Sequence, residues 1–415
     1  MRILCVTQQY RPELCAPAER FGQLADGLAA RGHQVTVLTT FPHFPRGGLH
    51  TGWRQRAWLD TTEGAVRVVR TPLLAIEGAT VVPKAVGYLS FAASALLQAG
   101  LRTWRPEVVV STSPPPTAAL AGAMLARRFR APHVVDVRDL WPEAVVQAGR
   151  VRPSVLMAGL DGATQGVLRR AAAVTTVSAG KRLRLLEQGA AAGRVHLLPH
   201  SVDVDAVVRT GQHHRGRARA LLAAAGVPAD ARVVLFAGVL NPAQGLDVAL
   251  DAWDLLRHSG RYGLHLVLAG DGLAADTLRA RALGSRNVTF CGPVPREIVL
   301  GLHACAWAAL VTLRPRGDTH TVPSKIAEAM AAGVPVLLSA DGEAADLVRS
   351  AGCGLVARAG DAGNLHDVVL ALHADDALAR RYGVAGQTHA RTHLGAEGSL
   401  DAWERLLTRV IGGFG

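Results

Sequence analysis

Short apolar runs alternate with longer amphipathic segments from one end of the chain to the other. The runs are rich in Val, Leu and Ile, a pattern typical of parallel strands that are covered on both faces. In the first half we expect strands at residues 2–7, 33–40, 67–72, 107–113, 133–139, 173–178 and 194–199. In the second half we expect them at residues 232–238, 264–270, 287–292, 308–313, 334–340 and 354–357.

Helical patterns lie between most of these strands, and glycine often marks the turn from strand to helix. Two examples are "PAERFGQLADGLAARG" at 17–32 and "TAALAGAMLARRF" at 117–129. Repetition of strand, glycine and helix predicts a doubly wound parallel α/β sheet. Because the scheme runs through twice, the sequence predicts two Rossmann-like sheets that face each other across an inter-domain cleft.

A polar and basic stretch without a strand pattern separates the two halves, near Asp205–Gly216. We therefore predict an N-terminal domain over 1–205 and a C-terminal domain over 206–398. The length of 415 residues also favours two domains over one core. The amphipathic segment within 399–415 has no strand after it, so we expect a helix that packs back on the first domain.

Composition narrows the class of partner. Aromatic residues make up only 5% of the chain, which argues against stacking on nucleic acid, and we expect no nucleic-acid partner. The net charge of +12 and the predominance of Arg favour anionic ligands such as phosphates or acidic lipid. A coding bias toward Arg would produce the same excess.

Cysteine, histidine and terminal patterns bound the cofactors and the location. The five cysteines include no C-x-x-C pair, and no H-E-x-x-H motif occurs, so we expect neither a disulfide framework nor a metal. The N-terminus lacks a long apolar signal segment, which favours a cytoplasmic protein. The apolar segment at 85–101 predicts a buried helix, or a helix that lies against the inner face of the membrane.

The stretch "TVPSKIAEAMAAG" predicts a helix that begins near Pro323 and ends at Gly333. We expect Ser324 or Thr321 to cap it. Its first-turn N–H groups and Lys325 form a ready site for an anion such as a diphosphate. Glu328, three residues further on the same face, is suited to accept hydrogen bonds from a diol. The alternative is an exposed Lys–Glu pair on an alanine-rich helix.

Further candidates in the second half follow predicted strands. Asn241 and Gln244 offer uncharged hydrogen-bond groups, and Gly245 lets the backbone approach a ligand closely. Gly342 and Glu343 follow the strand at 334–340 and are expected to face the same ligand. A plain strand–turn–helix connection is the alternative for the first group.

In the first half, charged residues follow one strand and open one helix. Arg138 and Asp139 come directly after the strand at 133–139, where ligand-binding loops are found. Glu19 and Arg20 lie in the first turn of the helix at 17–32. The alternatives are a salt bridge of Arg138 with an acid, and a Glu19 that only stabilises the helix dipole.

Taken together, these segments resemble the GT-B glycosyltransferases of family 4, which are retaining enzymes that use nucleotide sugars. The resemblance covers nearly the whole chain and is closest to the WbuB-like branch, which adds amino sugars to lipid-linked saccharides. The strings that carry it are "CAPAERFGQLADGLAARGHQVTVLTTFPHFPRG", "STSPPP", "VVDVRDLWPE", "AQGLD", "LAGDG", "VPSKIAEAMAAGVPVL" and "DGEAADLV".

The resemblance implies a role for each matching residue. Glu328 matches the glutamate that holds the ribose of the nucleotide. Ser324 and Lys325 match the helix start and the cation near the diphosphate, and Gly245 matches the glycine under the phosphates. Asp139 matches the acid of the first domain.

The chain departs from the family pattern at four of its positions. His320 stands where the broader family has a second glutamate, Val239 and Gln244 replace an Arg and a Lys, and Arg138 replaces a His. Lys325, Arg314 and Arg316 are candidates to supply the missing positive charge.

The sequence therefore predicts a retaining glycosyltransferase that uses a UDP-sugar, including N-acetylated sugars, without a metal. Asp139 and Lys325 are the expected catalytic residues, and Glu19, Arg20 and Arg138 are expected on the acceptor side. The acceptor is expected to be a lipid-linked saccharide, with peripheral membrane contact. Two alternatives stay open: a soluble acceptor of secondary metabolism, and a nucleotide-sugar 2-epimerase with the same double-sheet fold.

Overall fold

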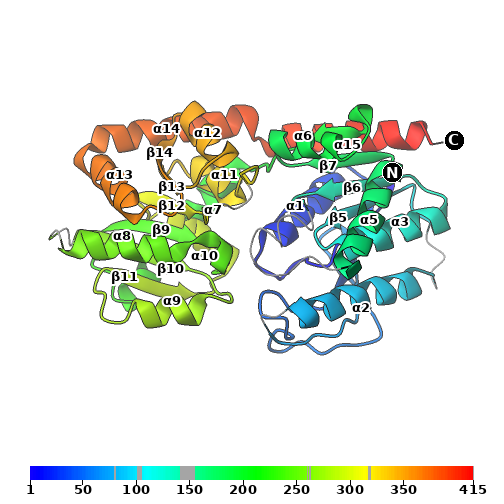
Figure 1. Cartoon of the computed structure of the whole chain (residues 1–415), viewed down its shortest axis with the longest axis horizontal. Coiled ribbons are helices and arrows are strands. Elements are labelled where there is room, and N and C mark those ends of the chain that lie inside the picture. Colours follow the sequence, from blue (N-terminus) through cyan, green and yellow to red (C-terminus); the bar gives the residue numbers. More distant parts are fainter. Residues whose placement is uncertain are drawn as a thin grey trace. The chain divides into compact units, whose positions relative to one another are not determined.

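The computed structural model describes residues 1–78, 81–100, 105–140, 155–258, 260, 263–315 and 319–414. The chain forms two compact units. The first comprises Met1–Pro199 together with Gly398–Gly415, and the second comprises His200–Glu397. Each unit is a sheet with helices on both faces (Figure 1).

The sheet of the first unit has the strand order β3-β4-β2-β1-β5-β6-β7-β8. Its strands are β1 (Arg2–Val6), β2 (Gln34–Thr40), β3 (Leu59–Glu63), β4 (Val66–Thr71), β5 (Val108–Ser113), β6 (His133–Val137), β7 (Ala173–Thr176) and β8 (Val195–Leu197). All neighbouring strands are parallel except β3, which pairs antiparallel with β4 at the sheet edge. The sequence did not predict β3, because "LDTTE" carries none of the apolar run that marks a buried strand.

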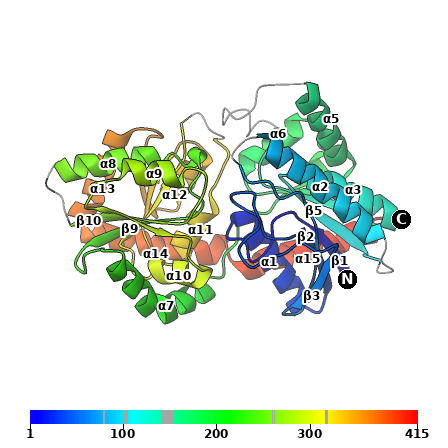
Figure 2. The same cartoon turned by 90° about the horizontal axis from the view of Figure 1, so that it is seen from below.

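The helices of the first unit cover both faces of this sheet. They are α1 (Ala16–Ala30), α2 (Val81–Gly100), α3 (Pro116–Phe129), α5 (Val155–Arg170), α6 (Ala179–Glu187) and α15 (Ala396–Gly412). Helix α15 packs Trp403, Leu406 and Leu407 into one core cluster with Phe21 of α1 and Ile3 of β1. Figure 2 shows this C-terminal helix, in red, beside α1 and β1, in blue.

The sheet of the second unit is entirely parallel, with the order β11-β10-β9-β12-β13-β14. Its strands are β9 (Arg232–Ala237), β10 (Leu264–Ala269), β11 (Val288–Gly292), β12 (Ala308–Thr312), β13 (Val336–Ser339) and β14 (Gly354–Ala357). Its helices are α7 (Val204–Ala224), α8 (Leu246–His258), α9 (Ala275–Arg281), α10 (Arg296–His303), α11 (Ser324–Ala331), α12 (Glu343–Ser350), α13 (Ala362–Ala374) and α14 (Asp376–His393). The fully buried Trp253 of α8 belongs to the largest core cluster, on one face of the sheet.

The division between the units lies slightly before the position expected from the sequence. The polar stretch around Asp205–Gly216 is not a linker but part of the continuous helix α7. Val204 and Val207 of this helix join the core cluster that contains Ile326 and Met330 of α11. Buried residues spaced by three along α7 therefore attach this basic helix to the second unit, and its charged residues lie on the solvent side.

Both sheets reverse their winding direction once. In the second unit the chain winds outward from β9 to β10 and β11, then starts again at β12 on the other side of β9. The first unit does the same between β1 and β5. In open α/β sheets, ligands bind beyond the carboxyl ends of the strands at such a switch point. A ligand site is therefore expected at each of these two edges, each within its own unit.

Candidate functional site

The loops that follow β9 and β12 are joined at the switch point of the second unit. The backbone N–H of Arg314 donates to Ala243 O at 3.1 Å, and Arg314 Nε donates to Pro242 O at 2.6 Å. Gly245 has a φ of +63°, and a Cβ added there would contact the backbone of Arg314. That contact would be of ordinary length, so the glycine is favoured here by its left-handed backbone conformation, which other residues rarely adopt.

Helix α11 begins beside this junction. Its alanine-rich face buries Ile326, Ala327, Ala329, Met330 and Ala331, which fixes its orientation. Pro323 occupies the N-cap position and no side chain caps the helix, so the expected capping by Ser324 or Thr321 is wrong. Ser324 is instead the first helical residue. Because Pro323 offers no side-chain acceptor at the N-cap position, the N–H groups of the first turn are suited to bind an anion.

Lys325 extends from α11 to the loop after β9. Its Nζ donates to Gln244 Oε1 at 2.6 Å and lies 3.9 Å from the centre of the Phe236 ring. It is also the closest group to Gly238, where an added Cβ would lie 3.2 Å from Nζ. Burial lowers the pKa of Lys325 to about 7, although Glu328 opposes this shift. An anion bound here would restore the full charge of the amine.

Gln244 and Asn241 lie in the same loop. Gln244, which stands at the position of the family lysine, is the acceptor for Lys325. The ammonium group of Lys325 therefore lies next to the place where the family pattern would put a cation. The Oδ1 atom of Asn241 is buried and has no hydrogen-bond partner among the described residues. The structure thus places Asn241, Gln244, Gly245 and Lys325 around one junction.

Glu328 lies one turn further along α11, and its side chain is only 16% exposed. Arg296 Nη1, at the start of α10, lies 3.0 Å from Glu328 Oε1. The buried His303 of α10 is electrostatically coupled to both residues. Arg296 and His303 were not predicted from the sequence, since only the fold brings these residues of α10 close to Glu328 of α11.

Gly342 and Glu343 fix the turn that contains His320. Glu343 N–H donates to Thr319 O at 2.9 Å, and Glu343 Oε1 lies 3.1 Å from His320 Nδ1. Gly342 has a φ of +71°, and a Cβ there would collide with the backbone of Thr319. This places the carboxylate of Glu343 beside His320, and His320 is the residue that stands where the broader family has its second glutamate. Arg316, which was proposed to supply charge, lies outside the described residues.

In the first unit, Asp139 follows β6 and is about half exposed. Its Oδ1 accepts a hydrogen bond at 2.8 Å from Lys181 of α6, whose ammonium also donates to Arg138 O at 2.6 Å. Lys181 is 1% exposed, so its aliphatic stem is packed in the unit and its charge is directed at Asp139. The sequence analysis missed Lys181. Trp141 and Glu143, which follow Asp139, lie outside the described residues.

Arg138 points into the first unit. Its Nε donates to Thr112 Oγ1 at 3.1 Å and its Nη2 donates to Pro114 O at 2.6 Å. Burial lowers the pKa of this guanidinium below its usual range. These contacts hold the loop after β5 against the loop after β6, which favours a structural role for Arg138 over contact with an acceptor.

Arg20 is also structural. Its Nε and Nη2 donate to the two carboxylate oxygens of Asp136 at 2.9 and 3.0 Å. The guanidinium also donates to the backbone oxygens of Leu198 and Pro199. Burial raises the pKa of Asp136, but Arg20 and Thr175 outweigh burial and keep it below its usual range. All three guanidinium nitrogens thus have protein partners, whereas the neighbouring Glu19 accepts a hydrogen bond from Gln23 on the outer part of α1.

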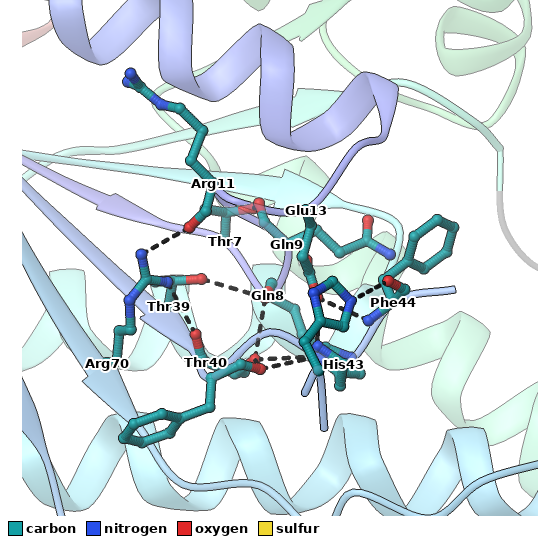
Figure 3. Close-up of polar contacts among 12 residues, drawn as sticks. Thr7, Gln8, Gln9, Arg11, Glu13, Thr39, Thr40, His43, Phe44 and Arg70 are labelled. Atoms are coloured by element: carbon teal, nitrogen blue, oxygen red, sulfur yellow. Dashed lines mark hydrogen bonds and ion pairs between the residues drawn. The ribbon is translucent and has the colours of Figure 1, made fainter. Parts of the chain in front are cut away.

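A buried polar cluster that the sequence analysis missed lies at the carboxyl ends of β1 and β2 (Figure 3). Glu13 Oε1 accepts the backbone N–H groups of His43 and Phe44, both at 2.8 Å. Gln8 Nε2 lies 3.3 Å from Nε2 of the same His43 ring. Arg70 reaches across and donates to Arg11 O at 2.6 Å. The only sequence signal was a glutamate in a loop with little other charge, and this cluster fastens the loop after β2 to the loop after β1.

Within the described part of the chain, no three His, Cys, Asp or Glu side chains are grouped so that they could hold a metal ion. In the same part of the chain, no helix is both long and apolar enough to cross a bilayer.

Two family models match the chain, one in each unit. Residues 16–201 match the glycosyl transferase 4-like domain, and residues 231–375 match glycosyl transferases group 1.

Curated relatives agree with these models. The chain is 25% identical to the colanic acid biosynthesis glycosyl transferase WcaI of Escherichia coli (strain K12), over 82% of this chain and 84% of that protein. It is 29% identical to a GDP-mannose-dependent phosphatidylinositol monomannoside mannosyltransferase of Mycobacterium tuberculosis (strain ATCC 25618 / H37Rv), over 63% and 72% of the two chains.

Solved structures with low sequence identity share the fold. The sucrose-phosphate synthase of Thermosynechococcus elongatus superposes with a TM-score of 0.73 at 19% identity, covering 99% of each chain. Anabaena HepE, solved in complex with UDP-glucose, gives a TM-score of 0.70 at 16% identity, covering 99% of this chain and 100% of its own.

Proposed function

The chain is a glycosyltransferase with a GT-B fold that uses a sugar-nucleotide donor, and we propose that it transfers a sugar from a UDP-sugar to a hydroxyl of a lipid-linked saccharide, with retention at C1. The observation that carries the proposal is the position of Lys325. Its ammonium group lies at the uncapped start of α11, against Gln244 and Phe236, at the switch point of the second unit. A helix start with an adjacent cation is suited to bind the diphosphate of such a donor.

The proposed chemistry needs no protein nucleophile. The bond between C1 of the sugar and the diphosphate oxygen breaks, and negative charge develops on the leaving diphosphate. The acceptor hydroxyl forms its bond to C1 from the same face and gives its proton to a leaving phosphate oxygen. Lys325 and the N–H groups of Ser324 and its neighbours stabilise the developing charge, an effect worth several kcal/mol in a site that excludes water.

The nucleoside is proposed to lie toward Glu328. This carboxylate is held on α11 one turn from Lys325, the separation that would let one helix contact a diphosphate and the ribose attached to it. Gly245, Asn241 and Gln244 would line the phosphates, and Gly342 and Glu343 would lie toward the donor sugar. Asp139, held by Lys181, is proposed as the acid of the acceptor side.

A lipid-linked acceptor is supported by the surface of α2. Ala85, Leu89, Ala93 and Leu97 recur every fourth residue and are all exposed, with Leu89 61% and Leu97 70% exposed. No helix of the described residues meets the requirements for crossing a bilayer, and an exposed apolar stripe on such a helix is typical of one that lies in the membrane interface.

Two further segments extend this stripe. Gln55 exchanges hydrogen bonds with the backbone of Leu73, and Leu74 N–H donates to Ser90 Oγ of α2. These contacts connect to α2 the two segments that carry the exposed Arg54, Arg56 and Trp58 and the exposed Leu74 and Ile76. Arginines beside apolar and aromatic side chains favour an anionic membrane surface. We call the set of Arg54, Arg56, Trp58, Leu74, Ile76, Leu89 and Leu97 the α2 surface.

The named relatives bear on both the donor and the acceptor. HepE was solved with UDP-glucose, which supports a UDP-sugar, whereas the mycobacterial relative uses GDP-mannose and acts on a phosphatidylinositol. The WcaI relative is named for colanic acid biosynthesis, which supports synthesis of a polysaccharide. An N-acetylated donor sugar belongs to the proposal through the resemblance of the sequence to the WbuB-like branch.

Two measurements test the proposal. Thermal shift with UDP-, GDP- and dTDP-sugars should show the largest rise in melting temperature for a UDP-sugar, because a ligand that binds only the folded state stabilises it. Transfer from that donor is then measured with a short-chain polyprenyl-diphosphate sugar in anionic vesicles and with soluble glycosides. Preference for GDP- or dTDP-sugars would overturn the donor assignment, and transfer only to soluble glycosides would favour a soluble acceptor. Conversion of the donor sugar without any acceptor would indicate an epimerase.

A further inference from the structure

Arg296 and His303 lie on the same face of α10, since they are seven residues, or two turns, apart. Helix α10 packs mainly on α7, and Leu300 of α10 joins the core cluster that contains Val207 of α7 and Ile326 of α11. Arg296 is the first residue of α10 and follows Pro295. Glu328 therefore faces two residues that no sequence motif connected with it.

The carboxylate of Glu328 is held on one side only. Arg296 Nη1 lies 3.0 Å from Oε1, close enough for an ion pair. Oε1 is nevertheless buried and accepts no hydrogen bond among the described residues. His303 is 3% exposed, and neither of its ring nitrogens has a hydrogen-bond partner in that part of the chain. Burial lowers the pKa of His303, so its ring is neutral near pH 7 and Arg296 is the cation of the group.

We propose that Arg296 is a positioning residue that holds Glu328 toward the two hydroxyls of the ribose, and that the donor is therefore a ribonucleotide rather than a 2′-deoxyribonucleotide diphosphate sugar. This inference rests on the proposed function, in which Glu328 contacts the ribose. It adds the residue that orients the carboxylate and excludes one class of donor, the dTDP-sugars.

The physical reason is the cost of leaving a buried carboxylate oxygen without a donor. A ribose offers two hydroxyls, and a carboxylate accepts both only when its plane faces the diol. A 2′-deoxyribose lacks one of them, and an unpaired buried acceptor costs enough to weaken binding by about tenfold or more. Without Arg296, the carboxylate of Glu328 can turn toward solvent, and the protein then no longer distinguishes ribose from 2′-deoxyribose.

Arginine suits this task better than lysine. The planar guanidinium presents a rigid set of N–H groups and fixes the orientation of a carboxylate, whereas an ammonium acts as a point charge. Arg296→Lys should keep the charge but hold Glu328 less firmly. This variant therefore separates orientation of the carboxylate from simple electrostatic attraction.

The test is calorimetric binding of UDP and 2′-deoxy-UDP to the full-length protein, with GDP and 2′-deoxy-GDP as a second pair in case the base differs. For the wild type we expect the deoxy form of the preferred nucleotide to bind at least tenfold more weakly. Arg296→Ala should reduce this ratio to within about threefold, and Arg296→Lys should give an intermediate value. If Arg296 contributes only to stability, its substitution should weaken the binding of both nucleotides equally and leave the ratio of their affinities unchanged.

Arg279→Ala is the matched control. Arg279 is in the same unit, pairs with Asp276 and is 38% exposed, against 37% for Arg296. The Arg279→Ala substitution should leave the ratio of the two nucleotide affinities at the wild-type value. Glu328→Gln separates the two levels of the proposal. If it changes neither the affinity nor the ratio, the ribose contact of the proposed function is wrong. If it abolishes the ratio while both Arg296 variants keep it, only the role of Arg296 is wrong.

Discussion

The charged residues at the two sheet edges differ in how many of their hydrogen-bonding groups have partners within the protein. In the first unit, Arg20 uses all three guanidinium nitrogens on Asp136 and two backbone oxygens. In the second unit, Lys325 has one protein acceptor among the described residues, Gln244 Oε1, together with the face of Phe236. Unused hydrogen-bonding capacity therefore marks a charged residue as a candidate for ligand binding better than its place after a strand does.

This difference predicts two kinds of mutant. Consider a charged side chain whose hydrogen-bonding groups all have partners within the protein. Its substitution should destabilise the unit that contains it and leave ligand binding intact. Substitution of an incompletely paired charge should leave the fold intact and weaken binding or catalysis.

Asp136→Asn should have the largest effect, on stability. It leaves the buried guanidinium of Arg20 without a counter-charge, and breaking one partner of a buried pair typically costs about 3–5 kcal/mol. Urea unfolding measures the loss, and calorimetry at a temperature where the variant is folded should give a UDP-sugar affinity within about twofold of the wild type. A variant with normal stability would contradict the structural role of this pair.

Lys325→Ala should reduce kcat by on the order of a hundredfold, since one preorganised cation at the leaving diphosphate is removed. The loss of the half-buried amine should change the free energy of unfolding far less than Asp136→Asn does. Steady-state release of UDP measures the rate. Turnover near that of the wild type would remove Lys325 from the mechanism.

The affinity for a UDP-sugar should depend on pH through Lys325. Its pKa is lowered to about 7 in the free protein, and a bound diphosphate favours the charged amine and so raises this pKa. Binding should therefore be tightest below pH 7 and weaken as the pH rises above 7, by up to about tenfold per pH unit. A UDP-sugar is the suitable ligand, because both its phosphate groups stay ionised over this range.

Lys325→Arg is the control for this titration, since a guanidinium stays charged across the range. Its binding curve should be flat between pH 6.5 and 8.5. A wild-type curve that is equally flat would show that the amine of Lys325 does not meet the diphosphate.

The smallest effect is expected at the α2 surface. Arg54→Glu with Arg56→Glu should weaken binding to anionic vesicles by roughly thirtyfold, because each of the two basic residues near such a surface contributes about 1 kcal/mol. Co-sedimentation with vesicles at low and high salt measures it. Arg217→Glu with Arg219→Glu, on the exposed side of α7, should have less effect. Equal losses from both pairs would indicate attraction by the net charge alone.

Most strands and the helix that starts at Ser324 could be predicted from the sequence, because buried parallel strands and glycine-bounded helices leave local patterns. Strand β3 could not, since its polar residues pair only with the edge strand β4. Among the candidate residues, Gly245, Gln244 and Lys325 lie together in the second unit. Arg20 and Arg138 were selected for the same reason as Lys325, yet their partners are all within the first unit.

The class of fold, the two sheets and the loops that follow their strands can be predicted from the residues alone, because they depend on periodicity and turn residues along the chain. Which charged groups find partners within the protein depends instead on the three-dimensional packing. Arg20 meets Asp136, Lys181 meets Asp139 and Arg296 meets Glu328 across long separations in the chain. Hydrogen-bond partners depend on how helices pack on a sheet, and no local pattern of residues encodes them.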